Sequence, residues 1–330
     1  MQRIGIPHGL FYYYYYPLWK TFFCDLGAEV ITSSQTNRRI IDKGIEAAVD
    51  EICFPLKVYL GHVEELLSKK LDYIFIPRIV SVERKSYICP KFIGIPDIVR
   101  AAIPHLPPMI DTIIDISKTD KFIKNDIVKL GKIFNSREKN IKEAYQHSCQ
   151  ELKFCRALAA QGCTMAEAIR IWEGESLDNN SETDLKIGVL GHGYSLYDES
   201  ISMNIIKRLR GMGCQVLLPE ALDRQSIETE AATIPKRMFW TLGRIMIGSA
   251  LHMAKRDDVD GIIYMACFGC GPDSMIGEII ERKLRNKPFM MITIDEHTGE
   301  NGLVTRLEAF CDMLRRRRSA SCENNLSAHG

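Results

Sequence analysis

The segment VDGIIYMACFGCGPDSMIGEIIERKLRN, residues 259–286, carries the pattern that decides the fold. Its apolar run at 259–267 predicts a buried strand, and the spacing of apolar residues at 271–286 predicts a helix. A strand that leads directly into a helix is the unit from which parallel sheets are built. The loop between them holds Cys267 and Cys270. This C-x-x-C pair fits a redox dithiol, half of a zinc site or part of an iron–sulfur site.

Strand and helix patterns alternate through the rest of the C-terminal part. A polar stretch at 175–184 lacks apolar periodicity and predicts a surface linker before this unit. The alternation is typical of a doubly wound parallel sheet with helices on both faces. The sequence predicts strands at 185–192, 214–220 and 287–297 and helices at 200–213, 235–257 and 302–318.

The N-terminal part alternates in the same way. From Lys121 to Trp172 the periodicity is helical throughout, which predicts a connector of helices after this unit. The sequence predicts strands at 3–7, 28–33, 71–80 and 108–116 and helices at 17–27, 55–69 and 95–104.

These patterns predict the fold class and the division into domains. We expect an α/β protein with two doubly wound parallel-sheet domains and a helical connector. The expected parts are an N-terminal α/β domain at 1–120, the helical connector and linker at 121–184, a C-terminal α/β domain at 185–318 and a disordered tail at 319–330.

Composition narrows the class of protein. The 330 residues are 46% hydrophobic and 26% charged, which is typical of a soluble globular protein. Lys and Arg number 43 against 42 Asp and Glu, and this balance gives no support for a nucleic-acid or membrane-surface partner. The one basic run, RRRR at 315–318, fits the last turn of a helix, where cations complement the helix dipole.

The sequence carries no recognisable targeting signal. No apolar run reaches the roughly 18–20 residues of a membrane span, and the N-terminus lacks the features of a secretory signal. We therefore expect a cytoplasmic protein without a membrane partner. In a reducing cytoplasm the 11 cysteines are expected to be thiols or metal ligands rather than disulfides.

Three cysteine-containing stretches fall at or near the positions where open parallel sheets gather ligands, beyond the carboxyl ends of strands. Cys53 stands at the entry of a predicted helix, Cys89 in the long loop after residues 71–80, and Cys270 two residues before Pro272. Helix N-termini and runs of backbone N–H groups stabilise thiolates and anionic clusters. From these patterns alone, a ligand role and a buried core role are equally supported.

Spacing limits the chemistry of the C-x-x-C pair. A thioredoxin-type dithiol follows the first strand of a small βαβ unit, whereas this pair lies late in the chain. Structural zinc requires a second C-x-x-C or a histidine pair, and the sequence has neither, nor a ferredoxin run of C-x₂-C-x₂-C. Scattered cysteines therefore fit a cluster between two domains better than a local finger. We expect core or incidental thiols at Cys24, Cys149, Cys155, Cys163, Cys214, Cys311 and Cys322.

Two further motifs offer acid–base groups. GVLGHGYSLYD at 188–198 follows a predicted strand and contains His192 and Tyr194. Its Gly-x-Gly pair suggests a backbone anion cradle, but no third glycine opens a helix, so the dinucleotide fingerprint is incomplete. The loop after the last predicted strand gathers Asp295, Glu296 and His297, which fit either proton transfer or a solvated helix-capping loop.

Six separated motifs carry a resemblance to a known family. They are IGIPHGLFYYYYYPLWKTFFCDLGAEVI (4–31), EICFPLKVYLGHV (51–63), DYIFIPRIVSVERKSYICPKFIGIPD (72–97), GHGYSLYD (191–198), FGCGPDS (268–274) and DEHTGENGLVTRLEAF (295–310). To about residue 318 the chain resembles the acyl-CoA dehydratase activase-related proteins, single-chain relatives of the 2-hydroxyacyl-CoA dehydratase and benzoyl-CoA reductase iron–sulfur subunits. Its similarity to those enzymes themselves and to double-cubane cluster proteins is more distant.

The resemblance implies two Rossmann-like domains with a low-potential [4Fe–4S] cluster between them. It also implies electrons from a separate ATP-hydrolysing activator that carries its own iron–sulfur cluster. In the dehydratases three cysteines hold the cluster, and one iron stays open to substrate or water. The matching positions in this chain are Cys53, Cys89 and Cys270, with Cys267 as an optional fourth ligand. A double-cubane cluster needs more clustered cysteines than this sequence offers.

Two functions are open on this basis. In the first, the protein is a reductase or a dehydratase-like enzyme whose cluster passes an electron to a small substrate, such as a CoA thioester. The proton donors or acceptors are then expected among His192, Tyr194, Asp295, Glu296 and His297. In the second, Cys267 closes the cluster and the protein transfers electrons without catalysis. A zinc or structural thiol site has less support. The dehydratases pair two different subunits, so both a homodimer and a heterodimer are open, and no CoA-binding motif matches.

Overall fold

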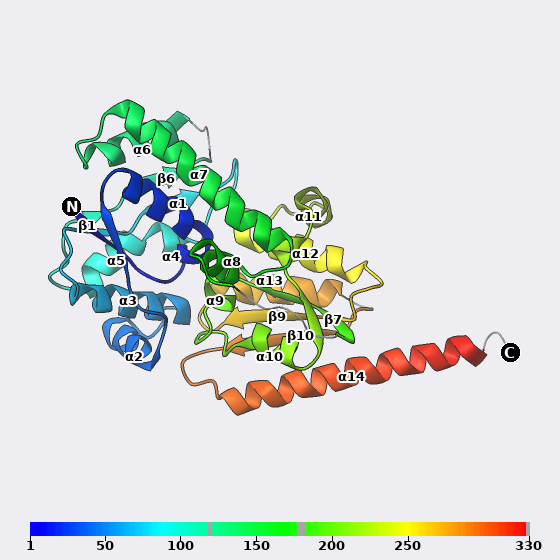
Figure 1. Cartoon of the computed structure of the whole chain (residues 1–330). Coiled ribbons are helices and arrows are strands. Elements are labelled where there is room, and N and C mark those ends of the chain that lie inside the picture. The colour runs from blue at the N-terminus through cyan, green and yellow to red at the C-terminus, as the bar shows by residue number, and fades with distance from the viewer. Residues whose placement is uncertain (118–120, 177–182, 285, 328–330) are drawn as a thin grey trace.

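The structure is a computed structural model that describes residues 1–117, 121–176, 183–284 and 286–327, without the side chains of 121–124 and 321–327. Two four-stranded parallel sheets, one in each half of the chain, are covered by helices (Figure 1). The expected α/β class with Rossmann-like parallel sheets is confirmed. The division into domains at the expected boundaries remains a prediction.

The first sheet has the strand order β2-β1-β3-β5, and its strands pair in parallel. A separate parallel pair, β4 and β6, follows β3 and β5 along the chain. The expected single strand at 71–80 is divided, because Pro77 has no N–H for the ladder. The strands are β1 (Arg3–Ile6), β2 (Glu29–Thr32), β3 (Tyr73–Phe75), β4 (Arg78–Ser81), β5 (Met109–Ile110) and β6 (Ile113–Asp115).

The helices of the N-terminal half include one that the sequence pattern does not predict. This helix, α2, buries only Ile40 and Gly44, so its apolar side is narrow. Helix α1 begins earlier than expected because Tyr13 and Tyr16 are buried and extend its apolar side. The helices are α1 (Tyr12–Asp25), α2 (Arg38–Ala47), α3 (Phe54–Leu67), α4 (Pro90–Ile93) and α5 (Ile95–Ala102).

Helices α2 and α3 cross with their backbones in contact. A Cβ atom added at Gly61 would lie 1.9 Å from the carbonyl oxygen of Ile40, and one added at Gly44 would lie 2.0 Å from that of Lys57. A side chain at either glycine would force the helices apart. The crossing therefore holds the first turns of α3 in place, immediately after Cys53.

The expected helical connector consists of α6 (Lys121–Lys132), α7 (Glu138–Ala160) and α8 (Met165–Trp172). Helix α7 lies along α1 (Figure 1), and Ile141 and Leu152 pack in the same apolar cluster as Phe22. Thr164 and Glu167 form a reciprocal capping box that starts α8. Residues 177–182 of the expected linker lie outside the described residues.

The second sheet has the strand order β10-β9-β7-β8, and it is also parallel. Strand β9 is buried along its whole length, as expected for a central strand covered on both faces. The strands are β7 (Leu185–Gly191), β8 (Cys214–Leu217), β9 (Gly261–Cys267) and β10 (Phe289–Ile294). The helices are α9 (Gly193–Leu196), α10 (Ile205–Gly211), the 3₁₀ turn η1 (Pro219–Ala221), α11 (Arg224–Ala231), α12 (Thr241–Ala254), α13 (Gly271–Lys283) and α14 (Glu300–Ser327).

Helix α14 continues to Ser327, although the sequence analysis expects a disordered tail from residue 319. Its basic run is engaged with the body of the protein, since Arg315 binds Asp184 at 2.6 Å and Arg318 lies 3.8 Å from Asp260. Because α14 continues to Ser327, the run at 315–318 does not occupy the last turn of a helix, and the expectation that it complements the helix dipole is wrong; these residues instead form ion pairs with the body of the protein. None of the described helices combines the length and the apolar character needed to cross a bilayer.

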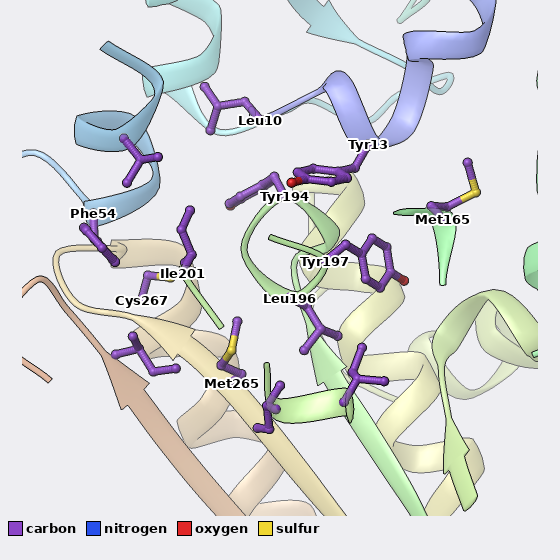
Figure 2. Close-up of a cluster of buried hydrophobic side chains, with 14 of the residues drawn as sticks. Leu10, Tyr13, Phe54, Met165, Tyr194, Leu196, Tyr197, Ile201, Met265 and Cys267 are labelled. Carbon is purple, nitrogen blue, oxygen red and sulfur yellow. The ribbon is translucent and has the colours of Figure 1, made fainter. Parts of the chain in front are cut away.

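The two halves meet through a shared core and a few polar contacts. Tyr13 of the first half and Tyr194 and Tyr197 of the second belong to one buried apolar cluster (Figure 2). Residues from the loop after β4 also pair with the second half, where Tyr87 forms a parallel bridge with Trp240. The loops at the carboxyl ends of β1 and β7 therefore lie against each other.

Candidate functional site

Three cysteines occupy the N-caps of three helices and line one pocket. Cys53 precedes α3, Cys89 precedes α4 and Cys270 precedes α13, and each helix has a proline in its first two positions. Proline is favoured there because its missing N–H is not needed at a helix start. The remaining lining is mostly apolar and consists of Leu10, Pro55, Leu56, Lys91, Phe92, Ile95, Tyr194, Gly271 and Pro272.

The backbone of each helix start donates to its own cysteine. The N–H of Leu56 donates to the sulfur of Cys53, and the N–H groups of Lys91 and Phe92 donate to that of Cys89. Cys270 accepts from the N–H of the third helical residue in the same way. Three helix dipoles thus place their positive ends at three sulfurs, which favours anionic ligands.

Burial nevertheless keeps these thiols protonated. It raises the pKa of Cys53 and Cys89, and the N–H donors and Lys91 reduce this effect without cancelling it. Burial, followed by the charge of Asp273, raises the pKa of Cys270 far above the ordinary thiol value. Buried thiols with aligned donors become stable thiolates when a cation binds, and this is the chemistry expected of metal ligands.

A glycine allows the loops that carry these cysteines to approach. Gly269 has φ +74°, and a Cβ atom there would lie 3.3 Å from the Cα of Cys53. Lys91 adds a bond across the same junction, with its Nζ 3.2 Å from the carbonyl oxygen of Gly269. Segments from both halves of the chain are therefore held together at the rim of the pocket.

Cys267 has a different environment from the other three. It ends β9, is 3% exposed and lies in the apolar cluster near Phe54 and Met265 (Figure 2). The hydroxyl of Ser195 donates to its sulfur, while burial raises the pKa of its thiol. Among the described residues, those that line the cysteine pocket do not include Cys267.

A buried carboxylate that the sequence analysis does not identify lies beside Cys270. Asp273 is 3% exposed, and its Oδ1 lies 2.7 Å from Nε2 of His192 and accepts from the hydroxyl of Tyr264 at 2.8 Å. Burial raises the pKa of Asp273, but His192, Tyr264 and Cys270 together outweigh burial and lower it. One ligand atom each from His192, Cys270 and Asp273 lie within 4.8 Å of one another, so these groups could also share a metal ion.

Tyr194 joins this cluster to the cysteine pocket. It lines the pocket and stacks on His192, with ring centroids 5.0 Å apart and an interplanar angle of 28°. Burial raises its pKa well above the usual value, and the neighbouring Asp273, Cys270 and Cys53 add to this shift. Tyr194 is thus a neutral phenol. The structure brings the predicted residues His192 and Tyr194 together with Cys270.

Comparison with known protein families gives two matches, which cover adjacent parts of the chain. The family model described as the CoA enzyme activase uncharacterised domain matches residues 3–222, which is more than half of the chain. The chain belongs to this CoA enzyme activase family. The model for the 2-hydroxyglutaryl-CoA dehydratase D-component matches residues 233–314. The expected resemblance to an activase-related, dehydratase-like family is confirmed. No curated protein matches the chain.

The candidate site of this CoA enzyme activase family member draws on both matched segments. Cys53 and Cys89 lie in the first segment, and Cys270 with Asp273 lies in the second. The site is thus formed only where the two segments meet in the fold.

The acidic loop at 295–297 forms a hydrogen-bonded turn. Asp295 accepts from the Thr298 hydroxyl at 2.7 Å and from the N–H of His297 at 3.0 Å, which closes a turn after β10. Glu296 binds Lys57 of α3 at 2.5 Å, and His297 is exposed. These three residues are not part of the described lining of the cysteine pocket, so the geometry favours a structural turn over proton transfer.

A second and larger cavity, about 610 Å³ in volume, lies between the two halves. It adjoins the carboxyl ends of β1 and β2, the edge where doubly wound sheets bind ligands. Its polar base is a chain of hydrogen bonds in which Ser33 Oγ contacts His62 Nδ1 at 2.9 Å, and Thr36 Oγ1 contacts Nε2 at 2.9 Å and donates to Asp198. Since one hydroxyl has one proton, His62 must donate from Nε2 and accept from Ser33.

Proposed function

We propose that the chain is an iron–sulfur protein in which Cys53, Cys89 and Cys270 hold a [4Fe–4S] cluster. In this proposal it accepts low-potential electrons from a separate ATP-hydrolysing iron–sulfur activator and passes them to a small substrate. The setting would be the cytoplasm of an anaerobic cell, with the chain as a homodimer or a heterodimer. The observation that carries the proposal is the convergence of three cysteine N-caps, from both matched segments, on one pocket.

The donor set fits such a cluster. Soft thiolates are the usual ligands of iron–sulfur clusters, and N–H···S bonds tune their potential. Each of the three sulfurs already accepts at least one backbone N–H, and the lining around them is largely apolar. When bound, the cluster would supply one-electron chemistry, while the chain supplies the ligands, the dipoles and the exclusion of water.

The position of Cys267 favours a cluster with three protein ligands and one open iron. Its sulfur is held by Ser195 and packs in the apolar core rather than lining the pocket. An open iron agrees with an enzyme that binds a substrate. The alternative, a non-catalytic electron-transfer protein with a closed four-cysteine cluster, requires Cys267 to turn toward the pocket.

The proposed proton donors are His192 and Tyr194. His192 is fixed by Asp273 at 2.7 Å, and Tyr194 is a buried phenol that lines the cysteine pocket. A phenol and a carboxylate-oriented imidazole beside an electron-donating centre could protonate a reduced substrate without exposing it to bulk water. Glu296 is proposed to act only through its bond to Lys57, which holds the first turn of α3.

The larger cavity has no lining residue in common with the cysteine pocket among the described residues, so we propose that the substrate meets the cluster at the cysteine pocket and not in this cavity. Its lining includes Asp198, Glu199 and Glu173, and this negative character disfavours the phosphates of coenzyme A. If the substrate is a CoA thioester, its nucleotide part must therefore lie outside this cavity.

The proposal is tested by the iron and sulfide content of the anaerobically purified full chain, together with its EPR spectrum after reduction with dithionite. We expect about four iron and four sulfide per chain, and loss of both in Cys53→Ala, Cys89→Ala and Cys270→Ala. Cys163→Ala is the matched control and should keep the cluster.

Four results separate the alternatives. Iron-free protein that cannot be reconstituted overturns the proposal, and zinc without acid-labile sulfide indicates a structural zinc site instead. An unchanged EPR spectrum in Cys267→Ala supports the open cluster. Loss of the cluster in that variant supports the closed electron-transfer protein.

A further inference from the structure

Asp273 stands at a helix position where a carboxylate usually caps the first N–H group, but in this structure that N–H already has another partner. Asp273 is the third residue of α13, where a carboxylate commonly reaches back to the N–H of the N-cap residue. That N–H, on Cys270, is bonded to the carbonyl oxygen of Cys267 at 3.1 Å. The carboxylate instead accepts from Tyr264 and contacts His192. Helix capping therefore does not explain why this carboxylate is buried.

The charge of Asp273 lies directly beside a proposed cluster ligand. Its carboxylate accepts a hydrogen bond from the thiol of Cys270, and its backbone N–H donates to the same sulfur. Nε2 of His192 lies 2.7 Å from Oδ1 of Asp273, while Nδ1 of His192 is buried and has no partner among the described residues.

We propose that Asp273 is a positioning residue that lowers the reduction potential of the [4Fe–4S] cluster, an inference that rests on the proposed function. Reduction adds one electron to the cluster, and the cluster of the activator loses one electron. A fixed negative charge in contact with one ligand opposes this addition, most strongly in surroundings of low dielectric constant. Asp273 thus contributes to the low potential for which ATP-driven electron delivery is needed.

The experiment is an EPR-monitored redox titration of the cluster-loaded full chain. Asp273→Asn keeps the side-chain shape and removes the charge, and we expect the reduction equilibrium constant to rise at least tenfold, about 59 mV for a one-electron couple. Tyr264→Phe removes a hydroxyl that partly neutralises the carboxylate, so its potential should move in the opposite direction. Asp273→Glu and the exposed-site control Asp97→Asn should match the wild type. A packing defect would not give opposite signs in two variants.

The outcomes separate this inference from the proposed function. Wild-type protein without iron overturns the proposed function. Equal potentials in loaded wild type and loaded Asp273→Asn overturn only the role of Asp273. A folded Asp273→Asn protein without iron also overturns it, because the carboxylate is then needed to form the site. If Asp273→Asn does not fold, the reduction potential of Tyr264→Phe becomes the test. An unchanged potential in that variant overturns the inference.

Discussion

His8 lines the larger cavity and lies against the buried His62, with ring centroids 5.8 Å apart. Burial lowers the pKa of His8 from 6.5 to about 4 and lowers that of His62 well below its usual value. Both imidazoles are therefore neutral near pH 7 in the folded protein. Unfolded histidines take up protons near pH 6.5, so acid favours the unfolded chain through these two residues.

We expect the free energy of unfolding to fall as the pH decreases from about 6.5 toward 4, because the unfolded state binds more protons in this window. His8→Asn should flatten this dependence. His147→Asn is the opposite control, since the hydrogen bond to Asp25 raises the pKa of His147 and adds stability at low pH that is lost as the pH rises. Urea unfolding at several pH values measures both slopes. A His8→Asn slope equal to that of the wild type would contradict the assignment.

The candidate ligands were more predictable from sequence than the residues that surround them. The positions of Cys53, Cys89 and Cys270 at helix starts could be predicted because a cysteine shortly before a proline is a local signal, whereas their role as ligands rests on the family resemblance and stays a prediction. Asp273 and Tyr264 could not be predicted, because a tyrosine inside an apolar strand is indistinguishable from a core residue until the fold brings it to a carboxylate. The one available signal was an acidic residue three positions after Cys270, where capping is the ordinary explanation.

At the scale of elements, the first sheet is less regular than its sequence suggests. Pro77 divides an apolar run that resembles one strand, and α2 is a short helix with little apolar surface. Helix α11 is missed for the same reason, because it buries only Ile227 and Ala231. These helices are stabilised mainly by packing against neighbours, which a sequence pattern does not record.

The crossing of α2 and α3 gives a sharp prediction. Gly61→Ala places a methyl group where the Ile40 carbonyl stands, and we expect a loss of at least about 2 kcal/mol in unfolding free energy from overpacking. Gly211→Ala, at the end of α10 with nothing within 4 Å of the added atom, is the matched control. It should be neutral or stabilising by up to about 1 kcal/mol. Chemical denaturation of both variants tests this, and a Gly61→Ala protein as stable as the wild type would refute the backbone contact.

At the scale of the whole molecule, a buried cation holds the two halves together. Arg244 of α12 is 6% exposed and binds Glu228 of α11 in its own half and Glu83 from the loop after β4 in the other half. Arg224 binds the same Glu83. The halves are thus joined by ionic groups at one edge and by Lys57 and Glu296 at another.

Removing this cation should be costly. Arg244→Met leaves two carboxylates with a missing partner, and we expect a loss of about 3 kcal/mol in unfolding free energy. Adding Glu83→Gln in the same chain should recover part of the loss, because one unpaired charge disappears. The surface pair of Arg282 and Glu278 supplies the control, and Arg282→Met should change stability by less than about 0.5 kcal/mol. Equal losses of unfolding free energy in Arg244→Met and Arg282→Met would show that the buried ion pairs of Arg244 add no more stability than a surface pair.

The distribution of the three cysteines along the chain has a consequence for biosynthesis. Two of the proposed ligands lie within the first 90 residues, and the third follows only at position 270. During translation the first half therefore emerges from the ribosome with its thiols exposed and without their third partner. If the proposed cluster is present, its insertion must wait for the C-terminal sheet to fold, so the iron–sulfur assembly machinery would act after synthesis of residue 270 and not on the first half alone.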